Sequence, residues 1–229
     1  MWTQGINSAP LLVQKCYATI DKFKEDFDVV LLTKENICQY IRLPEFVEEL
    51  YQKGHMSEAL HSDMIRLYLM ICYGGIWRDA TCYQSSPLPD FIHKAPFFMF
   101  SASMLSGYTS PIKCSSWFIK SNEGNPLLIK TYSFLCEYHR RFKTPHDYYI
   151  FHLVLSVLVD NDFECRQIWE QMPYVCNMNP HVLLYSFKEP YREDKYNQII
   201  SSCFIHKLTY KFDSGLLNTN NVLRHFMII

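Results

Sequence analysis

The sequence predicts an α/β fold, a single domain over residues 1–229 with a mostly parallel central sheet flanked by helices. Three observations support this prediction. Segments with helical periodicity alternate with short segments typical of strands, the strand-like segments are strongly apolar, and the connections between them are short. A chain of 229 residues is long enough to bury a sizeable core.

The first three predicted elements are a helix, a strand and a second helix. The stretch APLLVQKCYATIDKF (9–23) is typical of a helix and has Pro10 near its first turn. The β-branched run FDVVLLT (27–33) predicts a buried strand. The stretch LPEFVEELYQKG then predicts a second helix, which ends at Gly54.

A long apolar helix and a strand follow. Ser57 is a suitable N-cap for a helix that runs to Tyr73, where Gly74 and Gly75 stop it. The next segment, IWRDATCY (76–83), predicts a strand. The remaining expected strands are 97–103, 114–121 and a short one within 203–212, and the remaining expected helices are 126–142, 147–161 and 164–172.

Composition excludes several classes of protein. Hydrophobic residues make up 48% and charged residues 20% of the chain, which indicates a folded globular protein, and the net charge of −1 gives no sign of a nucleic-acid partner. The nine cysteines are scattered without a C-x-x-C pair, which argues against zinc and disulfides and favours a reducing compartment. No signal peptide is evident, and we expect a cytoplasmic protein with at most peripheral contact with the inner face of the membrane.

The stretch 61–83 places ionisable residues inside the most apolar part of the chain. Asp63 and Arg66 are three positions apart and share a helix face, so they form either a structural ion pair or part of a polar ligand cavity. Asp79 follows an apolar strand start, where Asp is unfavourable. It is either a ligand-binding or metal-binding residue or the cap of the next loop. Strand alternation puts Asp79 and Thr81 on one face.

The block SDMIRLYLMICYGGIWRDATCY resembles the S-D…R…G-G-x-W-x-D-x-D/T block of glycosyltransferases, and its D-A-T fits the capsular polysaccharide synthesis proteins best. This family is related to yeast-type initiating mannosyltransferases and to clostridial glucosylating toxins. Three further stretches are similar to family blocks in the same order: WTQGINSAPLLVQKC, DYYIFHLVL and IHKLTYK.

The resemblance implies a GT-A fold, which is a Rossmann-like domain. It also implies transfer of a hexose from a UDP- or GDP-hexose donor to a saccharide or lipid-linked saccharide acceptor, with retention of configuration. The process would be capsular or surface polysaccharide biosynthesis. A rival hypothesis is a catalytically silent nucleotide-sugar-binding protein, which is favoured by Thr81 at the second Asp position of the family's D-x-D motif. A nucleotide hydrolase is disfavoured, because no Gly-rich phosphate loop occurs.

The resemblance also assigns site residues. Asp63, Arg66 and Asp79 would be the catalytic residues. The donor-binding set is Trp2, Gly5, Asp63, Arg66, Asp79, Thr81 and Lys207. Asp147 and His152 would face the acceptor, although a core His and a helix cap explain them equally well. Trp117 is a further stacking candidate, or ordinary core.

The resemblance further implies a divalent cofactor, Mn²⁺ or Mg²⁺, held by Asp79 and His206. Thr81 weakens this expectation, because a hydroxyl is a poorer ligand for such ions than a carboxylate. His206 could instead be a packing residue. Lys207, or else Lys211, would neutralise the donor's diphosphate, and an alternative is that Lys207 and Arg78 replace the ion altogether.

Overall fold

The computed structural model describes residues 1–102 and 111–228. The contacts between residues group the chain into two compact units, each built from separate stretches. Unit 1 comprises Met1–Asn36, Arg78–His93 and Asn177–Ile229, and unit 2 comprises Ile37–Trp77 and Lys94–Cys176. The assignment of residues 1–229 to one domain stays a prediction.

The sheet of unit 2 has three strands in the order β1 (Gly75–Arg78), β4 (Cys114–Ser121) and β3 (Phe97–Ser101). Strands β3 and β4 pair antiparallel, with Phe97 opposite Ser121. All five residues of β3 are buried, so this strand is covered on both faces. Because side chains alternate between the faces of a strand, an aromatic run such as FFMFS is stable only when both faces are covered.

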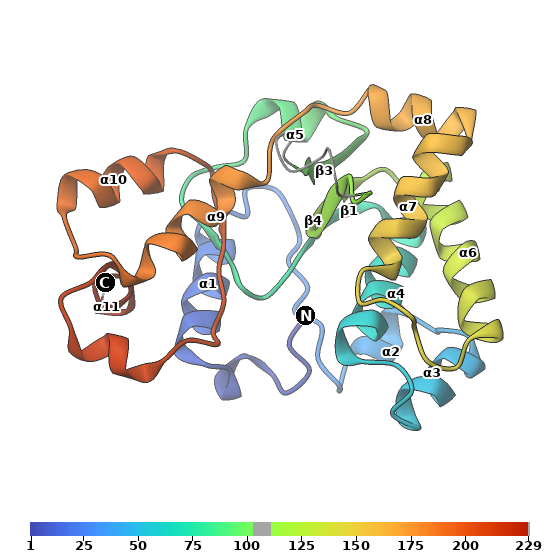
Figure 1. Ribbon diagram of the computed structural model, residues 1–229, viewed down its shortest axis with the longest axis horizontal. Coiled ribbons are helices and arrows are strands. Elements are labelled where there is room, and N and C mark those ends of the chain that lie inside the picture. The colour runs from blue at the N-terminus through green and yellow to red at the C-terminus, as the bar shows by residue number, and fades with distance from the viewer. Residues whose placement is uncertain (103–110, 229) are drawn as a thin grey trace. The chain divides into compact units, whose positions relative to one another are not determined.

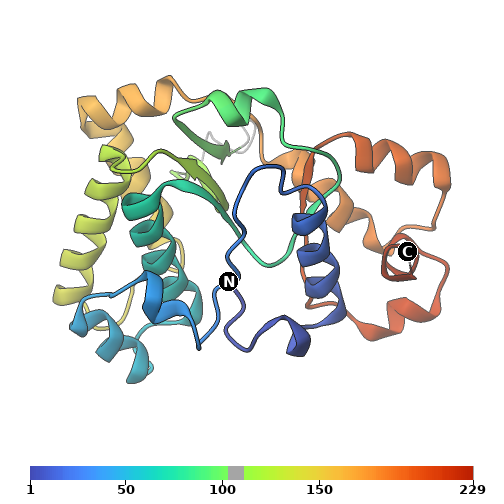
Figure 2. The same ribbon diagram turned by 180° about the vertical axis from the view of Figure 1, so that it is seen from behind.

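Unit 2 also contains several helices. They are α2 (Ile37–Tyr40), α3 (Glu45–Gln52), α4 (Glu58–Tyr73), α6 (Pro126–Arg141), α7 (Ile150–Asn161) and α8 (Phe163–Glu170). Helices α4 and α7 both contact β4, and α6 packs against both of them (Figure 1; Figure 2). Ser57 caps α4 by accepting a hydrogen bond from the backbone N–H of Leu60, and Gly74 ends the helix with a positive φ, as predicted.

Unit 1 contains a two-stranded antiparallel sheet of β2 (Cys82–Gln84) and β5 (Ile205–Lys207). Its helices are α1 (Leu11–Lys22), α5 (Asp90–Lys94), α9 (Met178–Tyr185), α10 (Glu193–Ser201) and α11 (Val222–Ile228), with short 3₁₀ turns at Ile6–Ser8, Ser186–Lys188 and Ser214–Asn218. Helix α1 packs on β2, where the Thr19 hydroxyl accepts from the backbone N–H of Gln84 at 3.0 Å.

Most of the predicted helices and strands are confirmed, but three expectations need correction. Residues 27–33 form no strand. Val29 and Val30 are exposed, and the Leu32 carbonyl accepts a hydrogen bond from the backbone N–H of Trp2. The predicted strand 76–83 is broken into β1 and β2 by a turn over residues 79–81. The structure does not show the mostly parallel central sheet, since both pairings that have a full register are antiparallel.

Part of the prediction for 97–103 lies outside the described residues. In the parts of the chain that the structure describes, every helix is too short or too polar to cross a bilayer.

Candidate functional site

Unit 1 brings together three of the predicted donor-binding residues, Asp79, Thr81 and Lys207. The Lys207 ammonium donates to the Asp79 carboxylate at 3.0 Å and to the Thr81 hydroxyl at 2.6 Å. The Lys207 and Asp79 side chains are 20% and 26% exposed, so solvent and solutes reach the pair. A cation thus lies between the two side chains that occupy the D-x-T positions.

The local fold explains this arrangement. After β1 the chain turns at residues 79–82, where the backbone N–H of Cys82 bonds to the carbonyl of Asp79 at 3.1 Å. Strand β2 then pairs with β5 so that Cys82 lies opposite Lys207. Leu208 continues the pairing by donating to the carbonyl of Thr81 at 2.9 Å. The Lys207 side chain therefore emerges beside the turn that holds Asp79 and Thr81.

His206 lies on the other face of β5, because neighbouring residues in a strand point to opposite faces. Its ring is fully buried, and its Nε2 atom is 3.2 Å from the Ser85 hydroxyl and 3.2 Å from the carbonyl of Ile200. Burial lowers the pKa of His206 to about 4, so the ring is neutral at physiological pH. The structure does not bring His206 to Asp79.

Arg78 is also directed elsewhere. Its guanidinium donates to the Gln84 side chain at 2.5 Å and to the carbonyl of Cys82 at 3.2 Å. These bonds tie the end of β1 to β2. In this geometry Lys207, and not Arg78, supplies the positive charge beside Asp79.

Two further predicted donor residues, Trp2 and Gly5, are in unit 1. The Trp2 ring meets Tyr210 edge to face, with ring centroids 5.4 Å apart. Its buried indole N–H has no acceptor among the residues that the structure describes. Gly5 has a φ of 79°, which favours glycine. The Lys211 ammonium lies over the Tyr210 ring at 5.9 Å, so Lys211 is not seen at Asp79.

Unit 2 contains the pair predicted on the apolar helix, Asp63 and Arg66. Their side chains are 9% and 7% exposed, and Arg66 Nε is 3.4 Å from Asp63 Oδ1. Arg66 also donates to the carbonyl of Ser116 at 2.7 Å and to the Ser62 hydroxyl at 3.1 Å. Its guanidinium lies over the Trp77 ring at 5.2 Å. The structural ion pair is thus present, and binding of a ligand by these two side chains stays a prediction.

The predicted acceptor residues lie at the start of α7. Asp147 is exposed, and its carboxylate accepts from the backbone N–H of Tyr149, the N-cap residue, at 2.6 Å. His152 is half-buried and contacts the Tyr149 and Phe151 rings edge to face. Trp117 is buried and stacks on Phe100 with centroids 4.5 Å apart, so it is a core residue.

The arrangement at Asp79 suits an anionic oxygen ligand better than a metal ion. Among the described residues there is no cluster of three or more His, Cys, Asp or Glu side chains that could hold a metal. The Asp79 carboxylate is engaged by an ammonium, and the predicted second ligand, His206, faces Ser85. Lys207 was predicted for the diphosphate, whereas Tyr210, whose ring meets Trp2, was not predicted. The only signal for Tyr210 in the sequence is an aromatic residue three positions after Lys207.

Comparison with known protein families gives a match over residues 1–226 to the model described as capsular polysaccharide synthesis protein. The match covers nearly the whole chain, including every residue that was predicted for the site. No curated protein matches the chain.

Proposed function

Because the chain belongs to the capsular polysaccharide synthesis protein family, we propose that it is a glycosyltransferase of capsular or surface polysaccharide synthesis. The donor is a nucleotide-diphospho-hexose, and the acceptor is a saccharide, free or lipid-linked. The observation that supports this proposal most directly is the Lys207 ammonium between Asp79 and Thr81.

This ammonium is suited to a diphosphate. An ammonium bonds to phosphate oxygens through charge-assisted hydrogen bonds, and half-buried surroundings strengthen the attraction relative to water. The Asp79 carboxylate holds Lys207 in place at 3.0 Å and can also accept from a ribose hydroxyl. Thr81 contributes a hydroxyl that, unlike a second carboxylate, does not repel the phosphates.

The reaction that follows is a transfer at the anomeric carbon. The acceptor hydroxyl forms the new bond to this carbon while the bond to the diphosphate oxygen breaks. The bonding electrons go to the departing diphosphate, which also takes the proton of the acceptor hydroxyl. In this proposal the product keeps the anomeric configuration, and Lys207 stabilises the negative charge that grows on the leaving group.

The geometry does not fit the predicted Mn²⁺ or Mg²⁺ site. Hard divalent ions bind chiefly through several charged oxygens, whereas Asp79 offers one carboxylate that is already paired with Lys207. We therefore propose no step through a metal ion, and the test below includes a chelator.

The test is a panel of UDP- and GDP-hexoses with and without Mn²⁺ and with a chelator, read by released nucleoside diphosphate and by calorimetric binding of UDP and GDP. Lys207→Ala should slow transfer by roughly 10²- to 10³-fold, as expected when one group that stabilises developing negative charge is lost. Asp79→Asn should lose most activity. Lys195→Ala, which breaks an exposed pair with Glu189, is the matched control and should leave transfer unchanged.

The outcomes separate the alternatives. Transfer that persists in chelator and fails in Lys207→Ala supports the ammonium as the cation of the site. Strict dependence on Mn²⁺ would restore the metal hypothesis. Tight binding of a nucleotide-sugar without turnover on any acceptor would establish the silent binding protein instead, and wild-type transfer by Lys207→Ala would refute the role of Lys207.

A further inference from the structure

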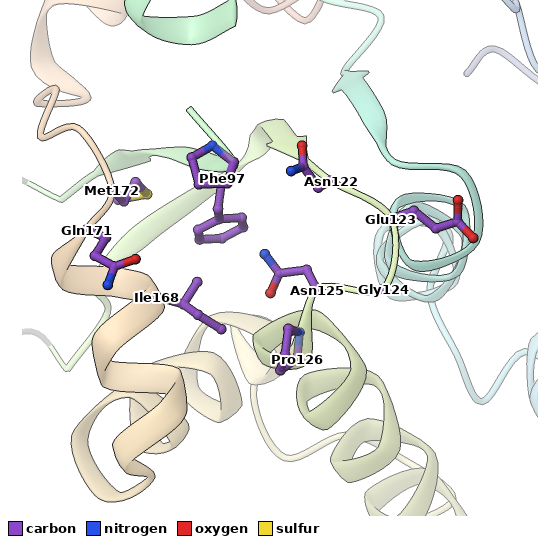
Figure 3. Close-up of a pocket in the computed structure, with 10 residues that line it drawn as sticks. Phe97, Asn122, Glu123, Gly124, Asn125, Pro126, Ile168, Gln171 and Met172 are labelled. Atoms are coloured by element: carbon purple, nitrogen blue, oxygen red, sulfur yellow. The ribbon is translucent and has the colours of Figure 1, made fainter. Parts of the chain in front are cut away.

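Unit 2 contains a cavity of about 250 Å³ that none of the predicted site residues lines (Figure 3). It lies where β4 leads into α6, beside the first residue of β3 and the C-terminal end of α8. Its apolar lining includes Phe97, Ile168 and Met172. The volume corresponds to about eight water molecules, which is room for one ring-sized compound.

Three carboxamide side chains line the cavity: Asn122, Asn125 and Gln171. The orientation of two of them is fixed by hydrogen bonds. Asn125 Oδ1 caps α6 by accepting from the backbone N–H of Leu127 at 2.9 Å and of Leu128 at 3.4 Å. Asn122 Oδ1 accepts from the Lys120 ammonium at 3.0 Å. Each amide nitrogen is therefore the group left to meet a ligand.

Asn125 presents the best-placed donor to a ligand in this cavity. The residue is only 8% exposed, and in Figure 3 its side chain points into the cavity. Its Oδ1 atom is used by the helix cap, and its Nδ2 atom bonds to none of residues 1–102 and 111–228. The amide N–H of Asn125 is therefore open to the cavity, where a ligand oxygen can accept from it.

The charges around the cavity favour a neutral ligand. The Lys120 ammonium is used by Asn122 and by the carbonyl of Ala95, and the Glu123 carboxylate points away from the cavity in Figure 3. Asn125 already satisfies the first N–H groups of α6, so these groups are not available to an anion. A nucleobase is disfavoured because Phe97 is 1% exposed and offers no open ring face for stacking.

We propose that this cavity is a saccharide-binding site that holds one neutral pyranose unit, whose hydroxyl and ring oxygens accept from Asn122 and Asn125. The site is separate from the Asp63–Arg66 pair. Arg66 bonds to Ser116 near the start of β4, whereas the cavity lies beyond Ser121 at its end, about five residues or roughly 17 Å along the strand. The proposal does not depend on sugar transfer.

The test is a titration of the full chain with glucose, galactose and N-acetylglucosamine, followed by NMR of the side-chain amides, with glucuronate and uridine as comparison compounds. At least one neutral sugar should shift the amide signals of Asn122 and Asn125. Asn125→Ser should weaken binding roughly tenfold, since serine keeps the helix cap but removes the amide donor. Asn125→Asp also keeps the cap and should weaken binding as well.

Asn161→Asp, an exposed change on α7, is the matched control and should bind sugar like the wild type. Unchanged binding by Asn125→Ser with its fold intact would overturn the proposal. So would the absence of shifts with all three neutral sugars, or a preference for uridine or glucuronate at these amides.

Discussion

Replacement of Gly74 by alanine should destabilise unit 2 strongly, because two costs coincide at this position. Gly74 ends α4 with a φ of 63° and a ψ of −150°, a conformation that side chains rarely adopt. A Cβ atom there would lie 2.7 Å from the backbone nitrogen of Glu123 and 2.9 Å from the carbonyl oxygen of Ser121. Both contacts are with backbone, which cannot swing aside.

The magnitude follows from these two costs. Backbone strain of this kind costs about 1–3 kcal/mol, and a forced overlap costs a further 1–3 kcal/mol. We therefore expect Gly74→Ala to lower the free energy of unfolding by about 4 kcal/mol. Gly75→Ala is a matched control, since Gly75 has a φ of 86° but nothing within 4 Å of its added Cβ. It should lose only about 1 kcal/mol once the lower entropy of the unfolded chain is included.

The measurement is urea unfolding followed by far-UV circular dichroism and by tryptophan fluorescence, to which Trp77 in β1 contributes. The expected difference between the two variants, about 3 kcal/mol, corresponds to a gap between the midpoints of roughly 1 M urea. Equal midpoints would refute the reasoning, since they would mean that the close approach of Gly74 to residues 121–123 adds nothing to the loss in the free energy of unfolding.

Three further predictions concern buried groups. Titration of the denatured protein should find nine free thiols. In the native protein, the exposed Cys72 should react with a thiol reagent well before the buried Cys82, because burial raises the pKa of Cys82 to about 11. Early reaction of Cys82 would contradict this. The pKa of His206 falls from 6.5 to about 4 on folding, so stability should decrease by up to about 3 kcal/mol as pH drops from 6.5 to 4. His206→Gln should flatten this slope, and urea midpoints across that range are the check. Asp63→Leu should cost about 3 kcal/mol, because the buried Arg66 charge would lose its carboxylate partner. A second change, Arg66→Met, should recover most of the loss if the pair is structural, and additive losses would contradict this.

The sequence could predict those elements whose signals are local. Ser57 and Gly74 bound α4 because a hydroxyl cap and a left-handed stop act within a few residues. The segment 114–121 has the sequence of a strand, and it forms β4. In contrast, 27–33 has the composition of a strand but pairs with no strand in the described part of the chain. Strand formation depends on a neighbouring strand, which the composition of a segment does not reveal.

The candidate site could also be predicted only in part from the sequence. Alternation along a strand predicted that Asp79 and Thr81 share a face, and both do reach Lys207, although they sit in a turn and not in a strand. The face occupied by His206 depends on the register of β5, which its own sequence does not specify. The cavity near Asn125 was not predicted, because the segment SNEGNP predicts only a turn and a helix start, and the apolar floor comes from distant segments.

The interleaving of the two units has a consequence for the order in which the chain acquires structure during synthesis. Unit 2 is complete once Cys176 has left the ribosome, but unit 1 still lacks Asn177–Ile229 at that stage. Strand β2 must therefore wait for β5, and Asp79 meets Lys207 only when nearly all of the chain has been translated. Until then the apolar face of α1 lacks the partners from α9 and α11 that cover it, so the growing chain is most exposed to chaperones and proteases in this interval. A chain cut after residue 176 would contain every segment of unit 2 but would lack Lys207, the partner of Asp79.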